Sequence, residues 1–402
     1  MKVLLLENIS GVAASQFEEA GFEVQSLSGA LDEAELMQKV RGAVILGARS
    51  KTHISAMVLD ASPELVAVGA FCIGVDKIDR AASSERGIGV FNDPHSNSRS
   101  VAELAMGEII LLMRRTFEAS TRLHGGEWNK SSAGSHEVRG QTLGIVGYGK
   151  IGSQVSDLAE ALGMRVVFHD VAHVLARGNA RAVSFRELLE SSDVITLHVD
   201  GKPQNQNLFG DEELQAMKDG ACLINMSRGF VVDHEALARH LKSGKLSGAA
   251  IDVFPQEPES GGAFRSPLQG LANVILTPHV GGSTEEAQQN IGQFVSAKMI
   301  DYFQSGNSLM SVNLPHCHLD YDPESGSHRL MHIHHNVPGI LRAINDILAD
   351  RGINIERQVL DTRANLGYAI YDINQTCDED LLAKLRSIPH TVRVRVPGKV
   401  RG

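Results

Sequence analysis

The sequence lacks several features that would each indicate a particular class of protein. It contains no run of about 18 apolar residues, the length that a membrane-spanning helix requires. The apolar run near the N-terminus, residues 3–6, ends at Glu7 and is too short for a signal peptide. The four cysteines are far apart and include no CxxC pair, which favours free thiols in a reducing compartment. We therefore expect a cytoplasmic protein.

Positive charge is also scarce. The chain has 38 Lys and Arg against 48 Asp and Glu, a net charge of −10. This balance disfavours nucleic acid and anionic membranes as partners, so any anionic ligand needs a local basic pocket. What the chain does have is 402 residues, 43% of them hydrophobic, and 39 glycines. These values predict two or three globular domains with many tight turns.

Two regions show the alternation of strands and helices that is typical of parallel sheets. In the first hundred residues the expected strands are 2–8, 43–49, 65–71 and 89–93. In the second region six continuous apolar runs, typical of strands covered on both faces, end near residues 149, 170, 199, 227, 254 and 279. Capping-box patterns at 100–103 and 283–286 predict two long helices that connect the regions.

The last 75 residues have a different pattern, in the order strand, helix, strand, strand, helix, strand, which predicts a small ferredoxin-like module. A polar segment with no periodicity precedes it. We therefore predict an α/β protein with two Rossmann-like or flavodoxin-like parallel-sheet lobes and this module. The expected parts are a discontinuous substrate-binding domain (1–97 and 284–315), a dinucleotide-binding domain (98–283), a linker (316–327) and a regulatory domain (328–402).

The segment "GIVGYGKIGSQV" has glycines at 147, 149 and 152 in G-x-G-x-x-G spacing. It follows a predicted strand, opens a predicted helix, and precedes Asp170 at the end of the next strand, as in dinucleotide-binding folds. A carboxylate at Asp170 can bond both ribose hydroxyls and would repel a 2′-phosphate, which favours NAD over NADP. The predicted cofactor-binding residues are Gly147, Tyr148, Gly149, Lys150, Ile151, Gly152, Asp170 and Asp252.

Arg228, Glu257 and His279 each follow an apolar strand of the second region. Ligands of open α/β sheets bind at the carboxyl ends of the strands, so these side chains are expected near the nicotinamide. A histidine can exchange a proton during hydride transfer, and a neighbouring carboxylate raises its pKa. An arginine can bind a substrate carboxylate through two hydrogen bonds. Together they predict a dehydrogenase active site.

Several motifs give a more specific indication. "GYGKIG", "NMSRG", "AIDVFPQEP" and "LTPHVGGST" resemble the successive signatures of the D-2-hydroxyacid dehydrogenases. "GARSKTH", "FCIGVDKID", "SNSRSVAELAMG" and "WNKSSAGSHEVRG" resemble the branch of that family that oxidises 3-phospho-D-glycerate, and the C-terminal module resembles an ACT domain. The resemblance implies NAD-dependent oxidation of 3-phospho-D-glycerate to 3-phosphohydroxypyruvate, the first step of L-serine biosynthesis, with feedback by L-serine.

The same resemblance implies roles for individual residues. Arg228, Glu257 and His279 are expected to be catalytic, as the strand positions already indicated. No metal is expected, and the chain is expected to form a homo-oligomer, a tetramer in this branch. The residues expected to bind the substrate are Arg49, Ser50, Lys51, Ile73, Gly74, Asn97, Lys130 and Gln288.

The stretch "MHIHHNVPGIL" (331–341) places three histidines within four positions. A metal site is one interpretation, but His335 faces away from His332 and His334 on a strand. Ordinary strand histidines are a second interpretation. The third is an effector site, because the resemblance implies that His334, Asn336 and Asn354 bind L-serine, across a subunit interface. Pro338 is expected to begin a helix.

Two other functions compete with this prediction. The scaffold also suits other D-2-hydroxyacid dehydrogenases, including enzymes that act on 2-hydroxyglutarate or 2-oxoglutarate. It further resembles NAD(H)-sensing transcriptional co-repressors, which retain the catalytic residues. The basic loop residues favour a phosphorylated substrate over the first alternative. The ACT-like module disfavours the second.

Overall fold

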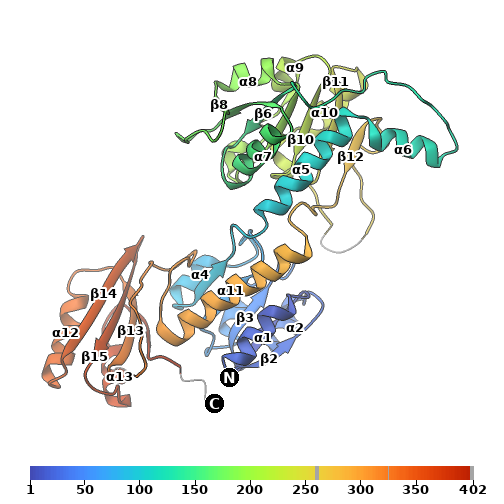
Figure 1. The fold of residues 1–402 in the computed structure, drawn as a ribbon. Helices are drawn as coiled ribbons and strands as arrows, with labels where there is room; N and C mark the ends of the chain where they lie inside the picture. The colour runs from blue at the N-terminus through green and yellow to red at the C-terminus, as the bar shows by residue number, and fades with distance from the viewer. Residues whose placement is uncertain (259–261, 325, 399–402) are drawn as a thin grey trace. The chain divides into compact units, whose positions relative to one another are not determined.

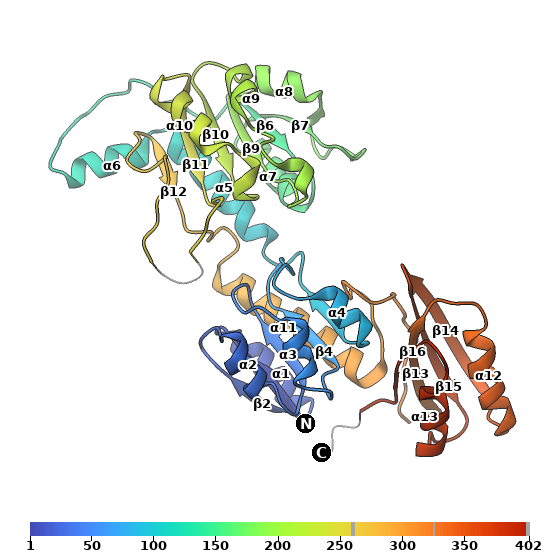
Figure 2. The ribbon, with the colours of Figure 1, turned by 180° about the vertical axis from the view of Figure 1, so that it is seen from behind.

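The computed structural model describes residues 1–258, 262–324 and 326–398. Its contacts divide the chain into two compact units, Met1–Pro94 with Gln288–Gly402 and His95–Ala287 (Figure 1, Figure 2). The first unit contains a parallel and an antiparallel sheet, and the second contains a larger parallel sheet. The predicted α/β class with two parallel-sheet lobes and an antiparallel C-terminal module is confirmed. The finer domain limits given above stay a prediction.

The parallel sheet of the first unit has the strand order β2-β1-β3-β4-β5, which is that of flavodoxin-like folds. Its strands are β1 (Lys2–Leu5), β2 (Glu23–Ser26), β3 (Ala43–Ala48), β4 (Ala67–Ala70) and β5 (Gly89–Asn92). Its helices are α1 (Gly11–Glu19), α2 (Glu33–Lys39), α3 (Ala56–Asp60), α4 (Arg80–Glu85) and the part of α11 (Glu285–Ser305) from Gln288 onward. Strand β2 was not predicted, because this edge strand is short, largely polar and partly exposed at every position.

The second unit has the order β12-β11-β10-β9-β6-β7-β8. All its strands are parallel, and successive strands are added on one side of β6 as far as β8 and then on its other side from β9 onward, as in Rossmann folds. Its strands are β6 (Thr142–Val146), β7 (Arg165–His169), β8 (Arg181–Ala182), β9 (Val194–Leu197), β10 (Ala221–Asn225), β11 (Leu246–Ile251) and β12 (Val274–Leu276). Its helices are α5 (Ser98–Met113), α6 (Thr116–His124), α7 (Lys150–Ala161), α8 (Phe185–Ser191), α9 (Asp211–Ala216) and α10 (His234–Lys242). The six predicted strands of this region are present, and β8 is an addition.

The long helix expected from Ser100 is two helices. Arg115 has φ 51° and separates α5 from α6, because a residue in the left-handed region ends a right-handed helix. The predicted capping box at Ser100 is wrong: α5 begins earlier, after Asn97, and Ser100 Oγ lies 2.9 Å from Thr284 Oγ1. The second predicted box is displaced by one residue, since Thr284 Oγ1 accepts the N–H of Ala287.

The C-terminal module has the predicted order of elements and the sheet order β14-β15-β13-β16. Its elements are β13 (His328–His335), α12 (Ile340–Asp350), β14 (Ile355–Arg363), β15 (Leu366–Ile373), α13 (Glu379–Arg386) and β16 (Thr391–Arg395). The expected helix start at Pro338 is wrong. Gly339 precedes α12 with φ 91°, a conformation that glycine adopts without strain.

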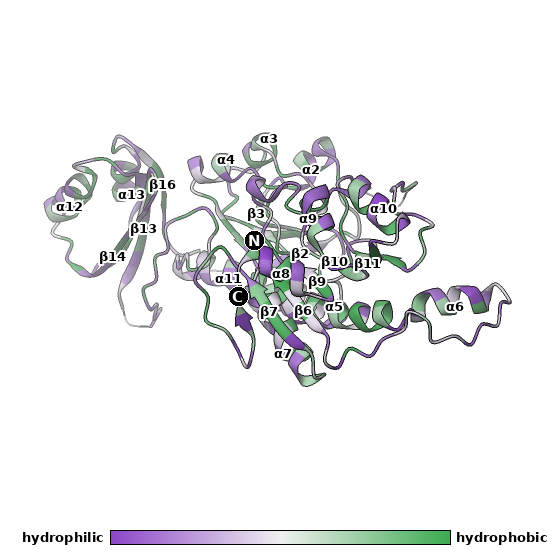
Figure 3. Ribbon diagram, turned by 90° about the horizontal axis from the view of Figure 1, so that it is seen from above, coloured by the Kyte–Doolittle hydropathy of each residue, from purple (hydrophilic) through white to green (hydrophobic). Residues whose placement is uncertain are grey.

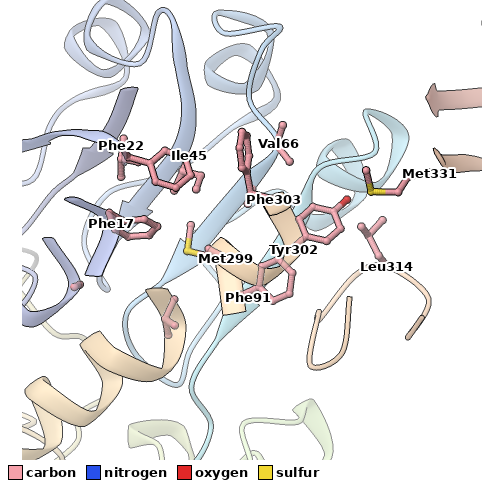
Figure 4. Close-up of a cluster of buried hydrophobic side chains, with 14 of the residues drawn as sticks. Phe17, Phe22, Ile45, Val66, Phe91, Met299, Tyr302, Phe303, Leu314 and Met331 are labelled. Carbon is pink, nitrogen blue, oxygen red and sulfur yellow. The ribbon is translucent and has the colours of Figure 1, made fainter. Parts of the chain in front are cut away.

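The two faces of the antiparallel sheet contribute to different cores. Met331 and Ile333 of β13 belong to the cluster that contains Tyr302 of α11, and Figure 4 shows Met331 near Tyr302. Leu330 belongs instead to the cluster formed with α12 and α13. Because successive strand residues point to opposite faces, His332 and His334 share the helix-covered face with Leu330.

Hydrophobic side chains gather inside each unit. Figure 3 shows α5 largely in the hydrophobic colour, and its residues Val101, Ala105, Ile109 and Leu112 are buried. The helix therefore serves as a covering element of the second unit's core. Among the residues that the structure describes, no helix has both the length and the apolar character needed to cross a bilayer.

Candidate functional site

The loop between β6 and α7 has the tight geometry that its glycines predict. Gly147 has φ 89°, and a Cβ there would lie 2.5 Å from the carbonyl oxygen of His198. A Cβ on Gly152 would lie 2.2 Å from the carbonyl oxygen of Gly147. Side chains at either position would thus force the loop away from the sheet. Gly149, in contrast, has no atom within 4 Å of the Cβ position, so open space lies beside it.

This loop and the start of α7 fit a dinucleotide. Gly149 precedes Lys150, the first residue of α7, and no side chain caps the free N–H groups there. Such a helix start binds phosphate through those N–H groups and the helix dipole. Lys150 is exposed at this end, whereas Ile151 packs on the core of the second unit. The residues present therefore suit the pyrophosphate of NAD.

Asp170 and Tyr148 fix the other side of the loop. Asp170 Oδ2 accepts the N–H of Tyr148 at 2.7 Å, and its Oδ1 accepts the N–H of Ala172 at 2.8 Å. The Tyr148 side chain points into the core, where its hydroxyl bonds Ser156 and its ring stacks on Phe168. Tyr148 thus contributes its backbone to this loop. Each carboxylate oxygen of Asp170, at the end of β7, can still accept a further hydrogen bond from a ligand.

The loops that follow β10 and β11 touch each other at glycine. A Cβ on Gly229 would lie 1.9 Å from the carbonyl carbon of Phe254, so only glycine permits this approach. Arg228 precedes this contact, and Asn225 Nδ2 donates to its carbonyl oxygen at 3.0 Å. No role was predicted for Gly229. Its position directly after the catalytic candidate Arg228 was the available signal.

Glu257 and His279 form a hydrogen-bonded pair at the same edge of the sheet. Nδ1 of His279 lies 2.8 Å from Glu257 Oε2, and Glu257 Oε1 accepts the N–H of Phe254 at 3.0 Å. A carboxylate only accepts, so the proton of a neutral His279 is on Nδ1. Nε2 of His279 has no hydrogen-bond partner among the described residues and can exchange a proton with a ligand.

The charges of this pair shift both pKa values in directions that keep it ionised. The hydrogen bond to Glu257 raises the pKa of His279 above its ordinary value, although burial and Arg228 act in the opposite direction. Burial alone would raise the pKa of Glu257, but hydrogen bonds from His279 and Phe254 outweigh it, and its pKa is lowered. The positive charge of Arg228 contributes to that lowering. All three predicted catalytic residues are therefore electrostatically coupled.

Asp252 holds the loop that carries His279. Its Oδ1 accepts from Thr277 Oγ1 at 2.6 Å and from the N–H of Val280 at 2.9 Å, and its Oδ2 accepts the N–H of Gly281 at 2.8 Å. Asp252 is 2% exposed. The structure thus shows this predicted cofactor-binding residue bonded to the 277–281 loop, where His279 adopts φ 54°.

Known proteins are similar to this chain over nearly its whole length. The D-3-phosphoglycerate dehydrogenase of Haemophilus influenzae is 49% identical over 98% of this chain and 97% of its own length. That of Escherichia coli is 48% identical over 98% of this chain and 97% of its own length. The chain belongs to the D-3-phosphoglycerate dehydrogenase family. It is an NAD-dependent oxidoreductase of the D-2-hydroxyacid dehydrogenase class.

The domain matches agree with this assignment. Residues 106–281 match the NAD-binding domain of the D-isomer specific 2-hydroxyacid dehydrogenases, and residues 330–393 match the ACT domain of the AHAS small subunit type. A solved D-2-hydroxyisocaproate dehydrogenase is 28% identical, with a TM-score of 0.71 over 76% of this chain and 98% of its own. The dehydrogenase lobes and the ACT domain are thus separate recognisable parts.

The predicted substrate residues of this chain come from several loops. Arg49, Ser50 and Lys51 follow β3, and the Glu7 carboxylate accepts the N–H groups of Ser50 and Lys51, each at 3.1 Å. It also accepts the N–H of Thr52 at 2.7 Å. Glu7 is 7% exposed. This role of Glu7 was not predicted, because in the sequence Glu7 only marks the end of an apolar run.

The loop after β4 is tied to the loop after β3. Cys72 Sγ lies 3.4 Å from the carbonyl oxygen of Arg49 and 3.1 Å from that of Gly74, so its single proton can be donated to either one. Asn92 Nδ2 donates to the carbonyl oxygen of Ile73 at 2.6 Å. The structure therefore brings together Arg49, Ile73 and Gly74 at the carboxyl edge of the first unit's parallel sheet, as parallel strands require.

The remaining predicted substrate residues are dispersed. Asn97 lies in the second unit, where a Cβ on Gly282 would come within 2.3 Å of its Nδ2. Lys130 is exposed in the segment that follows α6, and Gln288 is half-buried on α11. Their roles in substrate binding stay predictions.

The three predicted effector residues are not together within one chain. His334 is buried in β13, and Asn336 lies just beyond the carboxyl end of that strand. Asn354 precedes β14, whose first residue Ile355 pairs with Ile373 at the opposite end of the sheet. Since His334 pairs with Gly367, about six residues away along β15, the separation is on the order of 20 Å. Within the described residues no three His, Cys, Asp or Glu side chains gather as a metal site requires.

Proposed function

We propose that the protein oxidises 3-phospho-D-glycerate to 3-phosphohydroxypyruvate with NAD, the first step of L-serine biosynthesis, and that L-serine inhibits it. The observation that carries the proposal is the Glu257–His279 pair, in which Nε2 of His279 has no hydrogen-bond partner among the described residues and senses the charge of Arg228. The two relatives named above, called D-3-phosphoglycerate dehydrogenases, support the substrate. The ACT domain supports the regulation.

Each catalytic side chain has a distinct task. Nε2 of His279 accepts the proton of the substrate hydroxyl as the carbon–hydrogen bond breaks. Bound NAD supplies the acceptor for the hydride. Glu257 stabilises the imidazolium that forms, because its carboxylate already accepts the Nδ1–H bond. Arg228 holds the substrate carboxylate with its planar guanidinium and stabilises the negative charge on the reacting oxygen in the reverse reaction.

The substrate carries two anionic groups on a chain with a net charge of −10, so local cations must select it. Arg49 and Lys51 are the cations of the loop that Glu7 organises, with Ser50 as a hydrogen-bond donor between them. Ile73 and Gly74 offer backbone N–H groups in the adjoining loop. Lys130, Asn97 and Gln288 complete the proposed set of substrate contacts.

L-serine binds, in this proposal, between the ACT domains of two copies of the chain. His334 and Asn336 lie at one end of the antiparallel sheet and Asn354 at the other, so one chain cannot supply all three to one small ligand. Two copies with opposed sheets bring Asn354 of one to His334 and Asn336 of the other. The protein is accordingly a homo-oligomer, and we propose a tetramer.

One experiment tests the activity. NADH formation is measured with 3-phospho-D-glycerate and with unphosphorylated D-glycerate at equal concentrations. We expect kcat/KM to be at least about a hundredfold higher with the phosphorylated substrate, because the loss of a charged contact costs several kcal/mol. Equal rates with the two substrates would contradict the proposed substrate.

A second experiment tests the regulation. L-serine at millimolar concentration is expected to inhibit the wild-type enzyme. Asn336→Ala and Asn354→Ala should abolish inhibition and leave uninhibited turnover nearly unchanged, because neither residue lies in the dehydrogenase site. An uninhibited wild-type enzyme would contradict the regulatory proposal.

A further inference from the structure

Two buried histidines of β13 form a hydrogen-bonded pair inside the ACT domain. His332 and His334 are 0% and 1% exposed, and their Nδ1 atoms lie 3.2 Å apart. Burial lowers the pKa of His332 to about 4 and also lowers the pKa of His334. Both rings are therefore neutral near pH 7, and each carries a single N–H.

The hydrogen-bonded chain continues to the start of β16. Thr391 Oγ1 lies 3.2 Å from Nε2 of His332 and donates to the carbonyl oxygen of Leu385, also at 3.2 Å. A hydroxyl has one proton, and a carbonyl oxygen can only accept. Once Thr391 donates to Leu385, its oxygen accepts the Nε2–H of His332, whose bare Nδ1 then accepts the Nδ1–H of His334.

The opposite arrangement forms one hydrogen bond fewer. If Thr391 donated to His332, then His332 would donate to His334 through Nδ1–H, which gives two hydrogen bonds in place of three. The carbonyl oxygen of Leu385 would lose the hydroxyl donor and keep only backbone contacts at the end of α13, among them the N–H of Ile388 at 3.4 Å. Because an unmade hydrogen bond is costly in a buried site, the first arrangement is favoured.

Nε2 of His334 is the free end of this chain. It has no hydrogen-bond partner among the described residues, and it lies over Gly367 of β15, where a Cβ would come within 2.4 Å of it. Since Nδ1 carries the proton, Nε2 offers a lone pair. It can accept a hydrogen bond from an O–H or N–H group, and it has no proton to donate to a carboxylate.

We propose that His332 and Thr391 are positioning residues of the L-serine site, which hold His334 as the Nδ1–H tautomer. His334 then accepts a hydrogen bond at Nε2 from the ammonium or hydroxyl group of the effector. The amides of Asn336 and Asn354 are left to bind the effector carboxylate. This inference rests on the proposed inhibition by L-serine.

The tautomer is measured directly in the full-length protein. Two-bond ¹⁵N–¹H spectra of ¹⁵N-histidine-labelled enzyme are recorded near neutral pH, without and with L-serine. The signals of His334 are assigned by their loss in His334→Gln. We expect a protonated Nδ1 and an unprotonated Nε2 in both states. A protonated Nε2 on His334 in the presence of L-serine would overturn the inference.

Variants test the positioning role through inhibition. Thr391→Val and His332→Phe should raise the L-serine concentration for half-inhibition by about tenfold, the effect of one or two lost hydrogen bonds. Thr391→Ser keeps the hydroxyl and should behave as the wild type. Uninhibited turnover should stay the same in all three variants.

The outcomes separate the two proposals. If L-serine does not inhibit the wild type, the proposed regulation fails. If the wild type is inhibited but Thr391→Val and His332→Phe are inhibited equally well, the regulation stands and the positioning role is wrong. The nearly isosteric Thr391→Val keeps this test available even if His332→Phe does not fold.

Discussion

The dehydrogenase edge of the second unit and the antiparallel sheet of the ACT domain place polar side chains in opposite ways. In the second unit Arg228, Glu257 and His279 come after strands, and the Glu257 and His279 side chains are 37% and 49% exposed. In the ACT domain Arg329 and Asp372 lie within β13 and β15, and their side chains are 0% and 1% exposed. Both regions contain charged pairs.

The difference shows what each kind of polar group contributes. A group at the end of a parallel strand stands on a loop that the sheet core does not need, so it is available to a ligand. A group within a covered strand is part of the packing, and its loss leaves a partner unpaired in a medium of low dielectric constant. Substitutions at the first should change activity, and substitutions at the second should change stability.

The largest expected effect is at the dehydrogenase edge. His279→Ala should lower kcat by about 10²- to 10⁴-fold, because the proton acceptor is removed. NADH binding, followed by fluorescence titration, and the melting temperature should stay close to the wild-type values. Near-normal turnover in this variant would contradict the proposed mechanism and the expectation that strand-end polar groups control activity.

The matching change in the ACT domain is Asp372→Ala. Asp372 accepts from Arg329 at 2.7 and 2.8 Å, and its removal leaves a buried guanidinium without a counter-charge. We expect the free energy of unfolding to fall by about 3–5 kcal/mol. The control is Asp346→Ala, which breaks the exposed Arg342–Asp346 pair of α12 and should cost less than about 0.5 kcal/mol. Urea denaturation of the variants measures both, and equal losses would contradict the contrast.

A smaller effect is expected when the catalytic pair keeps its shape but loses its charge. Oxidation requires neutral His279, so the rate rises with pH through the raised pKa of this residue. Glu257→Gln removes the carboxylate that raises the pKa, so the acidic limb of the kcat profile should move to lower pH. The maximal rate should fall by about 10- to 100-fold. An unmoved limb would mean that another group controls the profile.

The smallest expected effect concerns the cofactor. Asp170→Ala should lower the preference for NAD over NADP by about tenfold, because the carboxylate no longer bonds the ribose hydroxyls or repels a 2′-phosphate. The ratio of kcat/KM values for the two cofactors measures it. Asp170 also accepts two backbone N–H groups, so the control is thermal stability, which should fall only slightly. An unchanged ratio would contradict the role of Asp170.

Much of the fold and of the catalytic site could be predicted from the sequence. The apolar runs of the second unit and the glycines at 147, 149 and 152 are local signals, and parallel strands place their carboxyl ends on one edge. That rule alone located Arg228, Glu257 and His279. The βαββαβ order of the ACT domain followed in the same way from periodicity.

Other features depend on contacts between distant parts of the chain. Glu7 is an unremarkable acid after a strand until the structure shows it bonded to the loop at 50–52. Asp252 carries the loop of His279 through three hydrogen bonds, which no local pattern indicates. The break between α5 and α6 is at Arg115, a residue whose type does not predict a left-handed conformation.

By itself, the sequence determined most of the strands, the order of elements in the ACT domain and the edge of the second unit that carries the chemistry, because strand period, glycine turns and strand-end residues are local properties. Only the tertiary structure decided how those residues are held. The hydrogen bonds that Glu7 and Asp252 accept, and those made by Thr391, join positions that are far apart in sequence or that face each other across strands. Their partners are set by the packing of whole elements, so the energy of each bond exists only once the chain is folded.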